Sequence, residues 1–125
     1  MRFDTIKNFT DKVKQNLNDD SLNIVNAAKC CCEIMKKDVS KGNALKFLKE
    51  YLKYDYKNIA CIGDAENDVE MAKIVTENGG MSISMGNGTI HLKEVSRFIT
   101  SPVGDNGFSR AVETILNINK KNSQI

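Results

Sequence analysis

Predicted strands alternate with predicted helices along the second half of the chain. The strands cover residues 58–62, 81–85 and 97–100, and helix-prone stretches separate them. Residues 58–62 form a short, continuous apolar run, which is typical of a strand buried on both faces. Strands that alternate with helices favour a parallel sheet with helical crossovers. From residue 58 onward, the chain is therefore predicted to fold as an α/β protein.

Helices are predicted before, between and after these three strands, and another is predicted near the N-terminus. Apolar residues recur at helical spacing in residues 4–17. Ser40 is a plausible N-cap for a helix that opens at residues 39–42. A helix over residues 67–78 would end at Gly79 and Gly80. Further helices are expected at residues 90–95 and 108–118, and the Lys- and Asn-rich tail is expected to fray.

The first 38 residues do not follow this alternation. Two extended segments, residues 22–28 and 30–35, come after a turn signal at residues 18–21. They indicate a separate antiparallel element. We therefore expect one unit over residues 1–38 and a second over residues 39–125.

Composition and charge exclude several classes of protein. The apolar fraction of 41% and the charged fraction of 27% are ordinary for a globular chain. A net charge of +2 gives no reason to expect nucleic acid or an acidic membrane as a partner. No apolar run approaches the roughly 20 residues that span a bilayer, and no signal peptide is visible at the N-terminus. A cytoplasmic location is expected.

The four cysteines do not have the spacing of a zinc site. Cys30, Cys31 and Cys32 are consecutive, Cys61 lies far from them, and His91 is the only histidine. No Cys-x-x-Cys pair occurs, so a zinc site is not expected. Adjacent residues in a strand point to opposite faces. The cysteines are therefore interpreted as small apolar side chains in a reducing compartment.

Two aspartates and an asparagine lie where a predicted strand turns into a helix. Residues 63–68 read Gly-Asp-Ala-Glu-Asn-Asp. Ligands of open α/β sheets bind at the carboxyl ends of the strands, and oxygen ligands there suggest Mg²⁺ and a phosphate. The alternatives are a helix-start acid at Asp68 and a cap or turn residue at Asn67. A calcium loop fails, because Val69 and Val75 stand where Gly and Glu are needed.

Residues 63–71, Gly-Asp-Ala-Glu-Asn-Asp-Val-Glu-Met, resemble the fourth motif of the haloacid dehalogenase superfamily. The closest likeness is to its Cof-type branch of sugar-phosphate phosphatases. Residues 33–34 and 39–45 resemble the third motif and its lead-in. The landmarks that follow in the branch's usual order are residues 85–88, 93–95, 99–100 and 105–107. The resemblance covers about residues 22–118.

The resemblance implies a fold and a set of roles. The fold would be the C-terminal half of a Rossmann-like parallel sheet with flanking helices, preceded by the last helix and strands of an α+β cap domain. Asp64 would ligate Mg²⁺, and Asp68 would act beside it in the metal site, holding a metal-bound water or orienting Lys41. Lys41 would offset negative charge on the phosphate and on the attacking carboxylate. Asn67 would help to position the substrate. Asn87 would contact the substrate or, alternatively, be a left-handed turn residue.

The sequence also departs from the family pattern. Gly88 follows Asn87 where the branch usually has alanine, and Asn106 replaces a second acid. Family members attack phosphorus with an aspartate of an Asp-x-Asp-Gly-Thr motif, and this sequence contains no Asp-x-Asp. We therefore expect a Mg²⁺-dependent phosphohydrolase part that is inactive alone. It would act on a small phosphorylated substrate and pair with an N-terminal fragment or with itself. The alternative is a non-catalytic binding or regulatory domain of the same fold.

Overall fold

The computed structural model describes residues 3–27 and 30–123. The chain divides into two compact units, Met1–Val39 and Ser40–Ile125. The division falls one residue after the boundary predicted at residue 38. Each unit has its own sheet.

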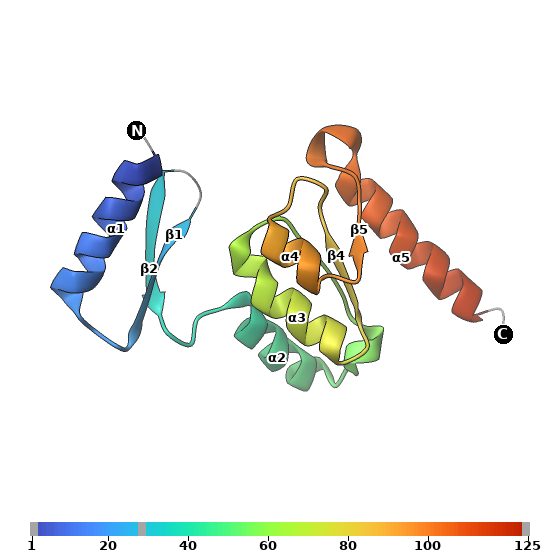
Figure 1. Ribbon diagram of the computed structural model, residues 1–125. Helices are drawn as coiled ribbons and strands as arrows, with labels where there is room; N and C mark the ends of the chain where they lie inside the picture. The colour runs from blue at the N-terminus through green and yellow to red at the C-terminus, as the bar shows by residue number, and fades with distance from the viewer. Residues whose placement is uncertain (1–2, 28–29, 124–125) are drawn as a thin grey trace. The chain divides into compact units, whose positions relative to one another are not determined.

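The first unit is a helix followed by a hairpin (Figure 1). Helix α1 (Phe3–Leu17) precedes strands β1 (Leu22–Ala27) and β2 (Cys31–Lys36), which pair antiparallel with Ile24 opposite Ile34. Ile6 of α1 and Ile24 of β1 are buried. The buried hydroxyl of Thr10 donates a hydrogen bond to Asn26 Oδ1 and so joins the helix to the hairpin. The predicted antiparallel element is present; Ala28, the end of the first predicted segment, lies outside the described residues.

The second unit alternates strands and helices as predicted. Its elements, in chain order, are α2 (Lys41–Leu52), the 3₁₀ turn η1 (Tyr56–Asn58), β3 (Ala60–Gly63), the 3₁₀ turn η2 (Glu66–Asp68), α3 (Val69–Glu77), β4 (Met81–Ser84), α4 (Ile90–Val95), β5 (Phe98–Ile99), the 3₁₀ turn η3 (Val103–Asp105) and α5 (Gly107–Ser123).

A three-stranded parallel sheet forms the centre of this unit. The strand order is β3-β4-β5, with Cys61 opposite Ser82 and Ile83 opposite Phe98. All three strands run in one direction, so their carboxyl ends share one edge of the sheet. The α/β fold class expected from the sequence is therefore confirmed.

Helices cover both faces of the parallel sheet (Figure 1). Helices α3 and α4 contact β4 on one face, and α5 crosses the other face to reach β3. Helix α2 packs mainly against α3. This leaves large apolar residues of α2 exposed, namely Phe47, Leu48, Tyr51 and Leu52.

The core lies between the sheet and α3. Cys61, Ala72, Val75 and Leu92 form one buried cluster from β3, α3 and α4. Burial of Cys61 agrees with its predicted role as a small apolar side chain. One buried polar side chain beside the cluster, Ser82, has two partners: its Oγ lies 2.5 Å from Thr76 Oγ1 and accepts a hydrogen bond from the Arg97 amide at 2.9 Å. Ser82 thus links β4 to α3 through Thr76, so this buried hydroxyl is satisfied.

The predicted elements differ from the structure at three places: Asn58, the predicted start of a strand, lies in η1, residues 67–68, the predicted start of a helix, lie in η2, and the last helix is longer than predicted. Helix α5 continues to Ser123, whereas the prediction ended it at residue 118 and expected fraying. Lys120 and Lys121 lie in the last turn of the helix, where cations favour the negative end of the helix dipole. Among the described residues, no helix is long and apolar enough to cross a membrane.

Leu92→Ala should destabilise the second unit strongly. Leu92 is fully buried, so removing its side chain leaves a cavity and is expected to cost about 2–5 kcal/mol of unfolding free energy. Leu48→Ala is the matched control, because Leu48 is also helical but about half exposed, at 48%. Urea denaturation followed by circular dichroism measures both. Equal losses in the two variants would contradict the assignment of the core.

Candidate functional site

The candidate site lies at the carboxyl-end edge of the parallel sheet. Gly63 ends β3, and Asp64 and Ala65 lead into η2. The neighbouring strand supplies the other side of the edge, since the Met85 amide donates to Gly63 O at 2.8 Å and the Thr89 amide donates to Asp64 O at 3.2 Å. The segments after β3 and β4 therefore lie together, as the parallel order predicts.

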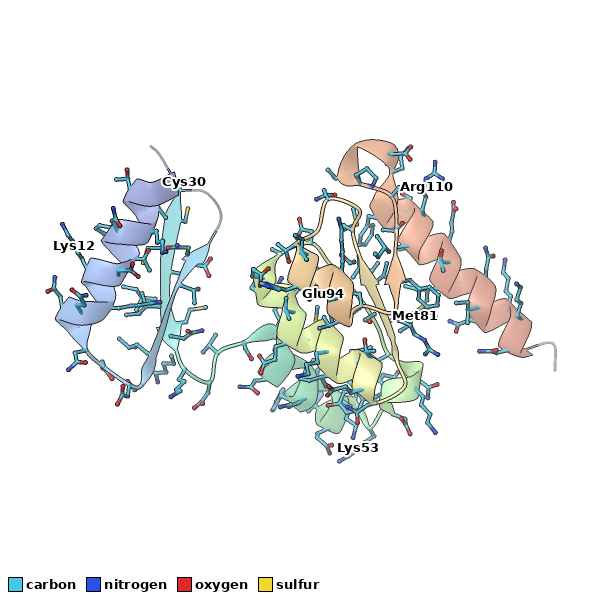
Figure 2. The ribbon with its side chains drawn as sticks, in the orientation of Figure 1. Lys12, Cys30, Lys53, Met81, Glu94 and Arg110 are labelled. Carbon is cyan, nitrogen blue, oxygen red and sulfur yellow. The ribbon has the colours of Figure 1, made fainter. Side chains whose placement is uncertain are left out.

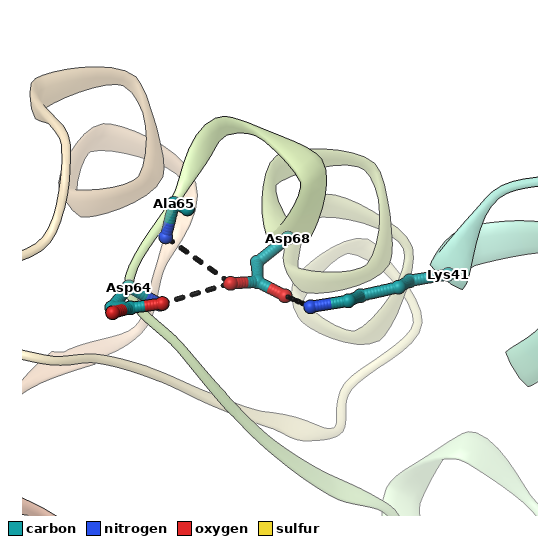
Figure 3. A network of polar contacts seen from close by, with 4 residues as sticks. All are labelled: Lys41, Asp64, Ala65 and Asp68. Carbon is teal, nitrogen blue, oxygen red and sulfur yellow. Dashed lines mark hydrogen bonds and ion pairs between the residues drawn. The ribbon is translucent and has the colours of Figure 1, made fainter. Parts of the chain in front are cut away.

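Asp68 is the centre of the polar contacts at this edge (Figure 3). Its side chain is only 3% exposed. Oδ2 accepts hydrogen bonds from the amides of Asp64, at 2.9 Å, and Ala65, at 3.1 Å. Oδ1 accepts from Lys41 Nζ at 2.5 Å. The carboxylate thus closes the strand-to-helix turn on one side and holds a lysine on the other.

Lys41 comes from a distant part of the sequence, 27 residues before Asp68. It is the first residue of α2, whose predicted N-cap is confirmed: Ser40 Oγ accepts from the Asn43 amide at 3.0 Å. The Lys41 side chain remains 49% exposed. Its ammonium group is therefore held by Asp68 and still accessible to a ligand from solvent.

Two glycines allow these elements to approach each other. A Cβ on Gly63 would lie 2.5 Å from Asp68 Cβ, so only glycine leaves room for the buried carboxylate beside β3. A Cβ on Gly42 would lie 2.7 Å from side-chain atoms of Glu70 in α3. The close packing of α2 on α3 thus places Lys41 next to η2.

The surroundings of Asp68 change its acidity. Burial alone would raise the pKa of this carboxyl group, but hydrogen bonds from Lys41 and from the amides of Asp64 and Ala65 outweigh burial and lower the pKa. Asp68 is therefore held as an anion although it is buried. The alternative of a helix-start acid also agrees with the structure, because Asp68 ends η2, precedes α3 directly and accepts a hydrogen bond from the Ala65 amide at the start of η2.

Asp64 differs from Asp68 in exposure and in hydrogen bonding. It is exposed, and among the described residues no hydrogen bond uses its carboxylate oxygens. Both oxygens are therefore free to bind a hard cation. No cluster of three or more His, Cys, Asp or Glu side chains suited to a metal occurs in the part of the chain that the structure describes. The candidate cation site thus offers one free carboxylate beside one that is already engaged.

The two asparagines have different positions. Asn67 lies exposed in η2, directly before Asp68 in the sequence. Asn87 follows β4, and its Oδ1 accepts from the Val103 amide at 2.8 Å. The left-handed turn considered for Asn87 is wrong, since the non-glycine residues with positive φ in the described chain are Asn18, Lys53 and Asn106. Asn87 instead ties the loop after β4 to the loop after β5.

One contact at the rim of the site was not predicted from the sequence. His91 Nδ1 lies 3.1 Å from Glu66 Oε2, which joins α4 to η2. The pKa of Glu66 is lowered chiefly by a hydrogen bond from Thr89, with a smaller contribution from His91. Thr89 caps α4 and could have been recognised as a threonine before a predicted helix. His91 carried no local signal, because its partner lies in a different element.

Asp68→Asn should remove an acid-sensitive part of the stability. A carboxyl group with a lowered folded-state pKa stabilises the fold above its unfolded-state pKa, and this stabilisation is lost as pH falls through the folded-state pKa. The thermal midpoint should therefore fall less steeply below the unfolded-state value of about 3.9 in the variant than in the parent chain. Asp11→Asn, at an exposed position of α1, is the control. Identical acid limbs in parent and Asp68→Asn would contradict the stabilising role.

Gly63→Ala should disrupt the site and the fold together. The added methyl group would overlap Asp68, and overpacking of this kind costs about 1–3 kcal/mol. Gly104→Ala is the matched control, because no atom lies within 4 Å of its added Cβ. Chemical denaturation of the two variants tests the contact. If Gly63→Ala were as stable as Gly104→Ala, Asp68 would not be packed against the end of β3.

The chain is similar in sequence to proteins named as phosphatases. A Streptococcus pyogenes protein named as a phosphatase is 38% identical over 93 residues, which cover 74% of this chain and 33% of that protein. The phosphoglycolate phosphatase of Archaeoglobus fulgidus is 42% identical over 73 residues, covering 58% of this chain and 31% of that enzyme. The chain thus spans about a third of the length of these relatives.

The fold also resembles solved structures of longer proteins. A haloacid dehalogenase-like hydrolase from Bacteroides thetaiotaomicron superposes with a TM-score of 0.75 at 23% identity, covering 92% of this chain and 41% of that one. Residues 2–112 match the family of haloacid dehalogenase-like hydrolases. The chain therefore belongs to the haloacid dehalogenase-like hydrolase family, an enzyme family that includes phosphatases.

Proposed function

We propose that this chain provides the metal- and charge-bearing part of a Mg²⁺-dependent phosphohydrolase. The observation that carries the proposal is the contact between Lys41 Nζ and the buried Asp68 carboxylate, beside the free carboxylate of Asp64. A cation and a free anionic oxygen side by side are what a phosphate bound to a metal ion requires. The family membership and the phosphatase names of the relatives support the same reaction class.

The oxygen donors fit Mg²⁺. This ion prefers oxygen ligands and keeps several waters, so one or two carboxylates and a phosphate are enough to hold it. Asp64 is the residue that would bind it, because its carboxylate is exposed and free. Asp68 would act through its neighbours, since its two oxygens already accept three hydrogen bonds. When bound, Mg²⁺ would neutralise charge on the phosphoryl oxygens.

Lys41 would lower the repulsion among anions at the site. A phosphate, Asp64 and Asp68 are all negative, and unit charges at close range repel strongly when water is partly excluded. Asp68 holds the ammonium group in place before substrate arrives, so little ordering is needed at the moment of reaction. Asn67, which is exposed in η2, would contribute hydrogen bonds to the substrate. Asn87 would shape the loop at the site through Val103.

A small phosphomonoester, such as a sugar phosphate, is the proposed substrate class. The phosphoglycolate phosphatase relative acts, by its name, on a compound of this kind. The unit of residues 1–39 would be the end of a cap domain, and the unit of residues 40–125 part of the catalytic core. We expect the cap to choose the substrate.

The nucleophile would come from another polypeptide segment. Among the strands that the structure describes, β3 pairs with β4 alone, so its other edge is open. A strand added at that edge would end next to Asp64, where an attacking carboxylate is needed. The greater length of the relatives supports an additional segment of this kind. The proposed partner is an N-terminal segment with Asp-x-Asp; pairing of two copies of this chain is the other possibility.

Reconstitution tests the proposal. The chain is mixed with an N-terminal segment of a family member that carries Asp-x-Asp-Gly-Thr, and hydrolysis of p-nitrophenyl phosphate is followed with and without Mg²⁺. Activity should require both pieces and Mg²⁺. Lys41→Ala should lower kcat by about 10²–10³, as the loss of one positioned charge-stabilising group does, and Asp64→Ala should lower activity at least as much.

Lys46→Ala is the matched control, because Lys46 lies on the same helix and is exposed. It should leave activity unchanged. Full activity of Lys41→Ala or Asp64→Ala in the reconstituted pair would refute the assigned roles. If the pieces associate and no hydrolysis follows, the non-catalytic binding domain becomes the better interpretation.

A further inference from the structure

The three consecutive cysteines do not lie as the strand pattern predicts. Cys30 is a turn residue just before β2, and Cys31 and Cys32 begin the strand. Neighbouring side chains within a strand point to opposite faces. Because Cys30 is outside the strand, its side chain is free to turn towards Cys31, and their Sγ atoms lie 3.7 Å apart. The expectation of opposite faces therefore fails for this pair.

Both members of the pair are accessible. Cys30 and Cys31 are exposed, whereas Cys32 is partly buried and Cys61 is buried in the other unit. Figure 2 labels Cys30 at the surface of the first unit, where β2 begins. No part of the proposed phosphohydrolase chemistry uses these thiols. Two reduced thiols held side by side at a surface therefore need an explanation of their own.

The distance between the sulfur atoms suits a bound ion. A tetrahedral ion with bonds of about 2.3 Å to sulfur holds two of its sulfur ligands about 3.8 Å apart. The observed 3.7 Å is close to that value, so both thiols could ligate one ion without moving apart. A disulfide within the pair is less suitable, because disulfide Cα atoms usually lie at least about 4.4 Å apart and adjacent residues are only about 3.8 Å apart.

We propose that Cys30 and Cys31 form a two-thiol chelating site for a thiophilic divalent cation with a filled d shell, Zn²⁺ or Cd²⁺. The ion would displace one proton from each thiol and form two metal–sulfur bonds. No third His, Cys, Asp or Glu side chain completes a cluster here within the described residues, so water would occupy the remaining positions. Cys32 is excluded, because it follows Cys31 in the strand and is partly buried.

Titration with Cd²⁺ tests the site. The full chain is kept reduced with a phosphine, Mg²⁺ is present in excess, and the ultraviolet charge-transfer band of cadmium–thiolate bonds is followed. This band reports sulfur ligands alone, so binding to carboxylates does not contribute. The parent chain should bind one ion. Cys30→Ser and Cys31→Ser should each weaken binding at least about tenfold, because each removes one of two thiolate ligands.

Cys32→Ser and Cys61→Ser are the controls, and both should bind as the parent does. Circular dichroism shows whether each variant is folded. Equal weakening in Cys32→Ser would show unselective thiol binding and overturn the proposal, as would an undiminished band in the Cys30→Ser/Cys31→Ser double variant. Asp64→Asn should keep the band, so failure of the phosphohydrolase proposal would not affect this result.

Discussion

The buried carboxylate of Asp68 joins the parts of the molecule on which the site depends. It accepts two amide hydrogen bonds from the turn after β3 and a third bond from Lys41 of α2. An unpaired charge at such a position would be strongly destabilising. The Asp64–Ala65 turn, the 3₁₀ turn η2 and the first turn of α2 must therefore stay in this arrangement. If they moved apart, the Asp68 charge would be buried without partners. Gly63 is part of the same constraint, since it leaves the space that Asp68 fills.

This arrangement separates two roles for two similar residues. Asp68 is buried and engaged, so it positions Lys41 and the turn. Asp64 is exposed and has free oxygens, so it is the carboxylate available to a ligand. The same short segment thus provides both a structural anion and a binding anion. Both residues are aspartates, so their different roles come from their positions in the turn after β3, which leaves Asp64 exposed and buries Asp68.

Much of the fold could be predicted from local patterns. Short apolar runs, the Ser40 cap and the Gly79–Gly80 stop are local signals, and the strands and helices lie close to where these signals placed them. The motif at residues 63–68 also indicated which carboxylates would lie at the sheet edge. The end of α5 was misjudged, because a polar Lys- and Asn-rich segment resembles a disordered tail in composition even when it continues a helix.

Contacts between distant elements could not be predicted in the same way. The hydrogen bond from the Val103 amide to Asn87 and the contact between His91 and Glu66 each join elements that are distant in the sequence. No local pattern marks the partners in either contact. The approach of Cys30 and Cys31 depends on one residue lying just outside a strand. The contact between Lys41 and Asp68 was expected only through the family resemblance, because 27 residues separate them.

Binding at the sheet edge is most directly tested by nuclear magnetic resonance of the isotope-labelled chain, titrated with Mg²⁺ and inorganic phosphate together. If Asp64 and Lys41 form one ligand site, the backbone amides of Lys41, Asp64, Ala65 and Asn67 should shift in a saturable manner, and those of the first unit should not. Saturable shifts confined to other residues, or none at the carboxyl end of β3 at saturating concentrations, would contradict the account.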